Sequence, residues 1–322
     1  MKISCISQNV MADMYTLNHA NDRYGHVKDK SVLEWNYRYP KLIQTIFGHD
    51  IICLQEVEIK NVPISKILMK ELNKIQLTNY KKYPNNIQEL IKNNINCLQK
   101  GENIPFFPFL IPELEKPDSK LLNPKQINEN FINDLPNYDY IHHFLCNVKT
   151  NVCDKYTNPI GNMILWNKDK FELVDFTLNS YSVSVKLKHI ETNIDFLLVN
   201  LHLKAGQYSC IKDRDFQLKS CFKLCTKMFN NGKTIIAGDF NDKLRELSLN
   251  RKIIEDNKFT VLDSYKTCDI YNHEDDTHSY CEFDHVASYD MDVIIGAAFE
   301  LNPIPNDKMP SDHYPLIFYV NL

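Results

Sequence analysis

Apolar and polar residues alternate along much of the chain with a period of two, the pattern of strands that bury one face. In other stretches, short apolar runs are bounded by polar or turn-forming residues, as expected of strands buried on both faces. Together the two patterns predict strands at residues 2–10, 50–57, 138–145, 162–166, 171–176, 181–188, 195–201, 233–237, 281–287, 290–295 and 313–320.

Two helices are predicted between these strands. Ser31 followed by Glu34 is a capping-box pattern, and the apolar positions after it favour a helix that Pro40 should kink or restart. A second helix is predicted at residues 213–229. Residues 77–136 are rich in Asn, Lys and Pro, and we interpret them as a peripheral insertion within a single domain that spans residues 1–322.

Composition and charge narrow the class of protein. With 43% hydrophobic and 24% charged residues, the chain resembles a folded globular protein rather than a disordered one. Its net charge of −4 argues against a broad basic surface that grips nucleic acid. The ten cysteines form no Cys-x-x-Cys pair, and no signal peptide or membrane-spanning run is visible. We therefore expect a cytoplasmic protein, in a reducing compartment, that has no membrane partner.

Polar residues gather where the predicted strands end. The segments are Gln8-Asn9, Leu54-Gln55-Glu56, Asn200-Leu201-His202-Leu203, Gly238-Asp239-Phe240-Asn241, Phe283-Asp284-His285 and Ser311-Asp312-His313. Strands that end together can hold carboxylates, imidazoles and amides around one small volume. Hydrolysis of an anionic phosphodiester needs such a set together with a cation, and Mg²⁺ suits a few hard oxygen ligands.

Each of these segments also has a simpler interpretation. Gly-Asp-Phe-Asn at residues 238–241 could be only a tight turn, since Gly, Asp and Asn are common turn residues. His202 alone is as easily a structural histidine as a catalyst, and Glu56 could mark the point where a strand meets water. The number and order of the segments favour the functional interpretation over these separate ones.

In that order the segments resemble the endonuclease/exonuclease/phosphatase superfamily, and within it the branch of nocturnin, the Angel proteins and the carbon-catabolite-repression deadenylases. Trp35-Asn36-Tyr37-Arg38 resembles the Trp-x-x-Arg helix of the deadenylase and Angel proteins, and His202-Leu203-Lys204-Ala205 is more similar to nocturnin. Two positions depart from the pattern: Gln8 replaces an aromatic residue, and His285 stands where the family commonly has Tyr.

The resemblance implies a four-layer α/β sandwich, in which two mixed β-sheets lie face to face and are flanked by helices. It also implies a Mg²⁺ site, in which Mn²⁺ could substitute. Glu56 matches the principal metal ligand of the family, Asn9 lies close by, and Asp312 matches a second carboxylate that acts directly or through water.

The catalytic roles follow from the same resemblance. Asp239 matches the residue that orients or deprotonates the attacking water, and Asn241 matches a donor to the phosphate oxygen that gains charge. His202 and His313 would bracket the phosphate, while Asp284 would hold the ring of His313. The sequence leaves open whether Asp239 or His313 is the base.

The implied activity is that of a magnesium-dependent phosphodiesterase, foremost a 3′-to-5′ exoribonuclease of deadenylase type acting on single-stranded RNA or an adenine nucleotide. The alternatives are an NADP(H) 2′-phosphatase, a 2′,3′-cyclic phosphatase, a DNA endonuclease and an inert binding module. Lys204 and Arg214 are weaker candidates for substrate binding, and Arg214 with Gln217 could instead fix the following helix.

Overall fold

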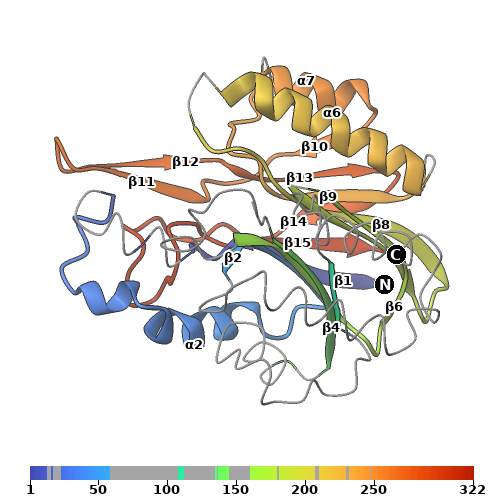
Figure 1. Ribbon diagram of the computed structural model, residues 1–322, viewed down its shortest axis with the longest axis horizontal. Helices are drawn as coiled ribbons and strands as arrows, with labels where there is room; N and C mark the ends of the chain where they lie inside the picture. Colours follow the sequence, from blue (N-terminus) through green and yellow to red (C-terminus); the bar gives the residue numbers. More distant parts are fainter. Residues whose placement is uncertain are drawn as a thin grey trace, which may run out of the picture.

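The strands form two large sheets and one hairpin (Figure 1). The computed structural model describes residues 1–12, 16, 23–58, 108–111, 135, 137–144, 160–179, 181–206, 210–229, 232–246 and 248–322. The seven-stranded sheet has the order β14 (Asp292–Ile295), β15 (Leu316–Asn321), β1 (Lys2–Asn9), β2 (Ile51–Glu58), β5 (Ile160–Asn167), β4 (Tyr138–Phe144) and β3 (Pro108–Ile111). The six-stranded sheet has the order β10 (Thr260–Leu262), β13 (Asp284–Tyr289), β9 (Thr234–Asp239), β8 (Ile194–His202), β7 (Ser182–His189) and β6 (Phe171–Asn179).

Successive side chains of a strand point to opposite faces of the sheet, and apolar residues on both faces let the sheet pack against a layer on each side. In β2, Ile51 and Cys53 face the core between the two sheets, whereas Ile52 and Leu54 face the opposite side. That opposite side is covered by helix α2 (Trp35–Ile46). Helices α6 (Ile211–Met228) and α7 (Leu249–Asp256) cover the outer face of the six-stranded sheet (Figure 1). The predicted four-layer α/β sandwich is therefore confirmed.

The start of α2 differs from the prediction. Ser31 lies inside a short 3₁₀ helix, η1 (Lys30–Leu33), whose N-cap is Asp29, and Glu34 is the N-cap of α2. The helix also runs through Pro40 without ending there. A proline in the second turn removes only one intrahelical hydrogen bond, and buried side chains such as Trp35 and Leu42 hold both halves of the helix on the sheet.

Several elements near the C-terminus were not predicted or were placed differently. The structure adds α7, β10 and a hairpin of β11 (Cys268–Asn272) and β12 (Thr277–Cys281), and it divides the strand predicted at residues 281–287 between β12 and β13. The last strand begins at Leu316, after the loop that contains Asp312 and His313. Strands β11 and β12 pair with each other and are short and polar. Their sequence therefore shows little of the hydrophobic periodicity on which strand prediction depends.

Most of the predicted insertion at residues 77–136 lies outside the described residues. Its one described strand, β3, pairs with β4 at the edge of the seven-stranded sheet. The strands at the centre of the two sheets come from other parts of the chain. The interpretation of residues 77–136 as a peripheral insertion stays a prediction. No described helix is long and apolar enough to cross a membrane.

Two parallel strand pairs bring functional residues to one edge of the sandwich. β1 pairs with β2, and β8 pairs with β9, so each pair ends on the same side. The buried side chain of Asn200 joins the two sheets: its Nδ2 donates to the carbonyl oxygens of Leu54 at 2.8 Å and Met163 at 2.9 Å. Gln55 Nε2 donates to Asn200 Oδ1 at 2.6 Å. These bonds fix the two sheets relative to each other beside the strand ends.

Candidate active site

Asn9 joins two acidic residues from the two sheets. Its Nδ2 donates to Oε1 of Glu56 at 3.0 Å and to Oδ2 of Asp239 at 3.1 Å. Its Oδ1 accepts a hydrogen bond from the backbone N–H of Met11 at 2.9 Å, which fixes the orientation of the amide. Asn9 therefore presents its NH₂ group to the site. It orients the two carboxylates, whereas the resemblance had placed it beside the metal.

The backbone at Glu56 is bent to aim its carboxylate into the site. The register between β2 and β5 shifts between Leu54 and Val57, and Glu56 has a φ of 58°. A bulge of this kind re-aims a side chain, and a left-handed conformation is costly for a residue other than glycine. Oε2 of Glu56 also accepts from the backbone N–H of Ala12 at 3.0 Å. Local strain and this second bond indicate a carboxylate held in one position.

Close packing of β8 against β9 sets the place of Asp239. In the parallel register His202 lies opposite Asp239, and Leu201 lies opposite Gly238. Gly238 has a φ of 145°, and a Cβ built on it would lie 1.9 Å from the carbonyl oxygen of Leu201. Only glycine fits this position. The absence of a side chain at Gly238 lets His202 and Asp239 stand side by side at the sheet edge.

Asn241 follows in the bend after β9. Its backbone N–H donates to Oδ1 of Asp239 at 2.8 Å, and its Nδ2 donates to the carbonyl oxygen of Leu203 at 2.9 Å. With a φ of 49° the residue adopts the left-handed conformation that asparagine tolerates better than most residues. The Gly-Asp-Phe-Asn segment is thus not only a turn: Gly238 and Asp239 end strand β9, and the bend at Asn241 fixes the Asp239 carboxylate.

Two histidines flank Asp239. The Nε2 atom of His202 lies 3.7 Å from Oδ2 of Asp239 and 3.9 Å from Oε1 of Glu56. The Nε2 atom of His313 lies 3.8 Å from Oδ2 of Asp239, while its Nδ1 is 2.8 Å from Oδ2 of Asp284. The structure therefore brings together the predicted set of His202, Asp239, Asp284 and His313, with Asp284 holding the ring of His313 as expected.

Burial and neighbouring charges shift the pKa values of Asp239 and His313. Burial raises the pKa of Asp239, and Asp284 adds to that effect, although His313 and His202 oppose it. For His313, burial disfavours the protonated ring, but Cys268, Asp284 and Asp239 together raise its pKa well above the ordinary value. His313 thus lies between the carboxylates of Asp284 and Asp239, and both of them favour its protonated form.

Asp312 is held by two residues that the sequence analysis did not identify. Its Oδ2 accepts from the Tyr24 hydroxyl at 3.0 Å and pairs with the Arg23 guanidinium at 2.9 Å. Burial would raise the pKa of Asp312, but Arg23, His313 and Tyr24 lower it below the ordinary value. Direct binding of a metal through this oxygen would compete with Arg23. Arg23 and Tyr24 lie in no recognisable motif, so only the tertiary structure identifies them.

Arg214 and Lys204, the two weaker candidates for substrate binding, differ in burial and in their hydrogen-bond partners. The guanidinium of Arg214 donates to the carbonyl oxygens of Lys204 at 3.1 Å and Gly206 at 2.8 Å, and the residue is buried. Gln217 accepts from the backbone N–H of Lys204. This geometry favours the alternative in which Arg214 and Gln217 fix the helix. Lys204 is exposed, and its Nζ pairs with Asp213 at 2.8 Å. Because this ion pair lies at the surface, a dissolved anion can still reach Lys204.

The donor set fits a divalent metal ion. Oε1 of Glu56 and Oδ2 of Asp239 share one donor on Asn9 and both face His202. Among the described residues, neither carboxylate forms an ion pair with a lysine or arginine. Two carboxylate oxygens without a lysine or arginine partner are suitable ligands for Mg²⁺, which prefers a few carboxylates and keeps several waters. Glu56 and Asp239 are the residues best placed to hold it.

Comparison with known proteins identifies the fold. No protein-family model and no curated protein matches the sequence. Among solved structures, an endonuclease/exonuclease/phosphatase from Bacteroides vulgatus has a TM-score of 0.57 at 15% identity, over 100% of this chain and 99% of that one. The human Nocturnin catalytic domain with bound sulfate has a TM-score of 0.55 at 14% identity, over 99% and 94%. ANGEL2, a 2′,3′-cyclic phosphatase, in complex with adenosine-2′,3′-vanadate has a TM-score of 0.55 at 14% identity, over 100% and 96%.

Proposed function

The chain has the endonuclease/exonuclease/phosphatase fold, and from this premise we propose that it is a metal-dependent phosphoester hydrolase. The observation that carries the proposal is the position of Asp239. Its carboxylate is bonded to Asn9 and Asn241 and lies within 4 Å of both His202 and His313. An inert binding module has no need of a buried carboxylate between two imidazoles, next to a second carboxylate on a strained backbone.

Each side chain has a distinct task in such a reaction. A bound Mg²⁺, held by Glu56 and Asp239, would neutralise charge on the phosphate. His202 stands beside both carboxylates and is placed to donate to a phosphate oxygen. Asn241 has a second amide hydrogen beyond the one given to Leu203, which is available to an oxygen that gains charge in the transition state.

We assign the general base to Asp239 and a cationic role to His313. Asp284 bonds to Nδ1 of His313, so the ring has one fixed orientation in which Nε2 faces the site. A protonated ring in that position stabilises the phosphate but accepts no proton. Oδ2 of Asp239 faces Asn9, the two histidines and the metal position, whereas Oδ1 accepts from the Asn241 backbone and keeps a second lone pair. Oδ1 is therefore the oxygen that can receive the proton of an attacking water.

The proposed substrate is the 3′ end of single-stranded RNA, cleaved stepwise to 5′-mononucleotides. The acidic net charge of −4 disfavours long-range contacts to many phosphates and favours recognition of a few terminal nucleotides. The resemblance of the Trp35–Arg38 and His202–Ala205 segments to the deadenylase, Angel and nocturnin proteins supports an adenine-containing ribose.

A second candidate is hydrolysis of a terminal 2′,3′-cyclic phosphate. It is favoured by the similarity in fold to ANGEL2, whose structure contains adenosine-2′,3′-vanadate. The two candidates require the same groups around one phosphorus atom and differ in the bond that is broken. A single assay can therefore separate them.

The test uses 5′-labelled oligonucleotides with Mg²⁺, with Mn²⁺ and with a chelator. The labelled substrates are oligo(A) and oligo(U) with free 3′-hydroxyls, oligo(A) with a 2′,3′-cyclic phosphate, and single-stranded DNA. NADP is tested separately for release of phosphate. We expect metal-dependent, stepwise shortening that is fastest on oligo(A). Loss of only the cyclic phosphate would assign the second candidate. An absence of hydrolysis on every substrate, in protein that binds Mg²⁺, would refute both.

The Glu56→Gln variant serves as the control for contaminating nucleases. It keeps the size of the side chain and removes the negative charge that faces His202. Any activity that it retains in full does not arise from this site.

A further inference from the structure

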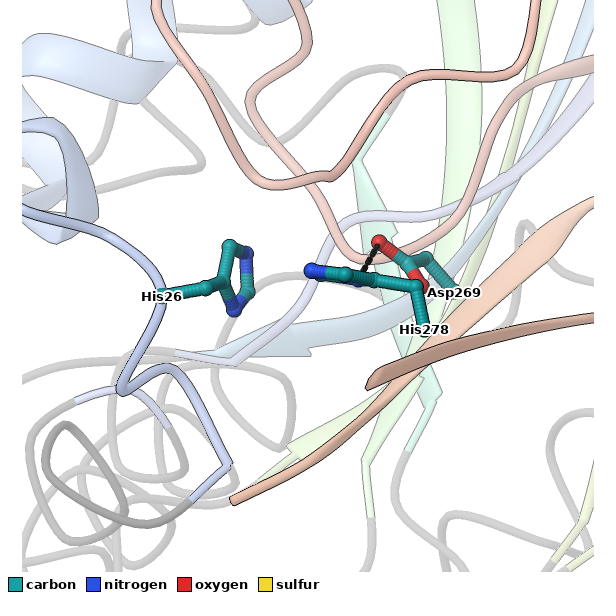
Figure 2. A group of neighbouring side chains, drawn as sticks. All are labelled: His26, Asp269 and His278. Carbon is teal, nitrogen blue, oxygen red and sulfur yellow. Dashed lines mark hydrogen bonds and ion pairs between the residues drawn. The ribbon is translucent and has the colours of Figure 1, made fainter. Parts of the chain in front are cut away.

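A second group of side chains of the types that bind metal ions lies beside the candidate active site. His26 comes from the N-terminal segment that also carries Arg23 and Tyr24, whereas Asp269 and His278 come from β11 and β12 of the hairpin (Figure 2). In Figure 2 the ring of His278 lies between His26 and the carboxylate of Asp269. More than two hundred residues of sequence separate His26 from the hairpin, so only the fold brings these groups together.

The geometry is close to that of a coordination site. Each residue offers one ligand atom, and these atoms all lie within 4.8 Å of one another. The Nδ1 atom of His278 lies 2.9 Å from both carboxylate oxygens of Asp269, and the rings of His26 and His278 have centroids 4.7 Å apart at 83°. Ligands at about 2.0–2.1 Å around one tetrahedral Zn²⁺ are separated by roughly 3.3 Å. Small side-chain rotations therefore suffice to reach a common centre.

The alternative is a structural ion pair between Asp269 and His278. That pair accounts for Asp269, whose Oδ2 also accepts from the backbone N–H of Ile304 at 2.9 Å. It does not account for His26. Both ring nitrogens of His26 are shielded from solvent. The backbone of Ile304 can satisfy at most one of them, so at least one has no hydrogen-bond partner among the described residues. A buried ring nitrogen without a partner costs free energy unless something else binds it. A metal ion would satisfy His26 and the pair together.

We propose that His26, Asp269 and His278 form a second metal site that binds Zn²⁺ and is separate from the Mg²⁺ site at Glu56 and Asp239. Two imidazoles and one carboxylate suit Zn²⁺, whereas Mg²⁺ prefers oxygen ligands alone. The side chain of His278 is 18% exposed and that of Asp269 is fully buried, so the ion has access from solvent while the carboxylate stays fixed. Three protein ligands leave one position for water or a substrate group.

The site would act as a clamp between the N-terminal segment and the hairpin. Three residues before His26, Arg23 pairs with Asp312, and Tyr24 donates to the same carboxylate. On the hairpin side, the backbone N–H of Asp269 donates to the carbonyl oxygen of Asp312 at 3.0 Å. A Zn²⁺ ion bound to both segments would therefore fix the two sets of contacts to Asp312. This clamp depends on no particular substrate.

Binding of Zn²⁺ to the metal-free protein, in excess Mg²⁺, tests the proposal. Calorimetry would give the stoichiometry, and the visible absorption of Co²⁺ as a substitute would report nitrogen ligation. The variants His26→Gln and His278→Asn each remove one ligand, and Asp269→Asn keeps the shape of the carboxylate. His273→Asn is the matched control, because His273 is exposed in the turn of the same hairpin and lies outside the cluster. Glu56→Gln with Asp239→Asn disables the other metal site.

We expect one equivalent of Zn²⁺ in the wild type, in His273→Asn and in the Glu56→Gln/Asp239→Asn variant. His26→Gln and His278→Asn should lose the Co²⁺ absorption, and Asp269→Asn should weaken Zn²⁺ binding by at least about 10-fold. Circular dichroism identifies any variant that fails to fold, and either histidine variant alone is then sufficient. Unchanged Zn²⁺ binding in both histidine variants, its loss only in the Glu56→Gln/Asp239→Asn variant, or no binding in the wild type would overturn the proposal.

Discussion

The sharpest structural prediction concerns Gly238, where the packing of two strands controls the site. In Gly238→Ala the new Cβ would lie 1.9 Å from the carbonyl oxygen of Leu201, whereas real Cβ atoms essentially never approach closer than 3.0 Å. The ends of β8 and β9 must therefore separate by about 1.1 Å. Asp239 follows Gly238 directly and lies opposite His202, so the separation moves these two side chains apart.

Two contributions set the expected loss of stability. A left-handed backbone costs a residue with a Cβ about 1–2 kcal/mol, and overpacking a close contact costs about 1–3 kcal/mol. The free energy of unfolding should fall by roughly 2–5 kcal/mol, measured by urea denaturation. A displacement of about 1 Å at the reacting groups should also lower kcat by on the order of a hundredfold.

Gly48→Ala separates the two contributions. Gly48 also has a positive φ, of 87°, but no atom lies within 4 Å of the position that a Cβ would occupy there. This variant should lose only the backbone contribution of about 1–2 kcal/mol and should keep the wild-type kcat. Gly238→Ala with the stability and turnover of the wild type would refute the reasoning, because the close approach of β8 and β9 would then not position the site.

The other predictions concern single side chains of the site. Glu56→Gln should abolish Mg²⁺-dependent hydrolysis while the urea midpoint stays near that of the wild type; full activity would remove Glu56 from the metal site. Asn241→Ala and His202→Ala should each lower kcat by on the order of a hundredfold, and a change in KM alone would contradict their roles in the transition state. Tyr24→Phe removes a hydrogen bond to a buried carboxylate, so it should destabilise the protein by about 1.5–3 kcal/mol in denaturant titrations at neutral pH. Tyr24 also helps to lower the pKa of Asp312 against the opposing effect of burial, so the stability that Asp312 contributes is present above its ordinary pKa and is lost as pH falls. Tyr24→Phe should therefore unfold at a higher pH than the wild type during acid titration, and an unchanged acid midpoint would contradict this coupling.

The sequence alone was enough to predict the layers of the fold and to select the residues of the candidate site. A strand that is buried between two layers must place apolar residues on both faces, and residues 51–54 do so in a way that a single sequence reveals. The polar residues that end such strands are equally visible, because they interrupt an apolar run. For this reason Glu56, His202 and Asp239 can be selected from the sequence alone.

Tertiary structure decided the orientation and the partners of those residues. Whether Asn9 offers oxygen or nitrogen to the site depends on the backbone of Met11, and whether Arg214 reaches substrate depends on the carbonyl groups around it. Neither the orientation of Asn9 nor the hydrogen bonds of Arg214 can be inferred from residue type or spacing. Arg23 and His26 reach their partners across more than two hundred residues of chain, and contacts of that range are fixed by packing of the whole sandwich rather than by local pattern.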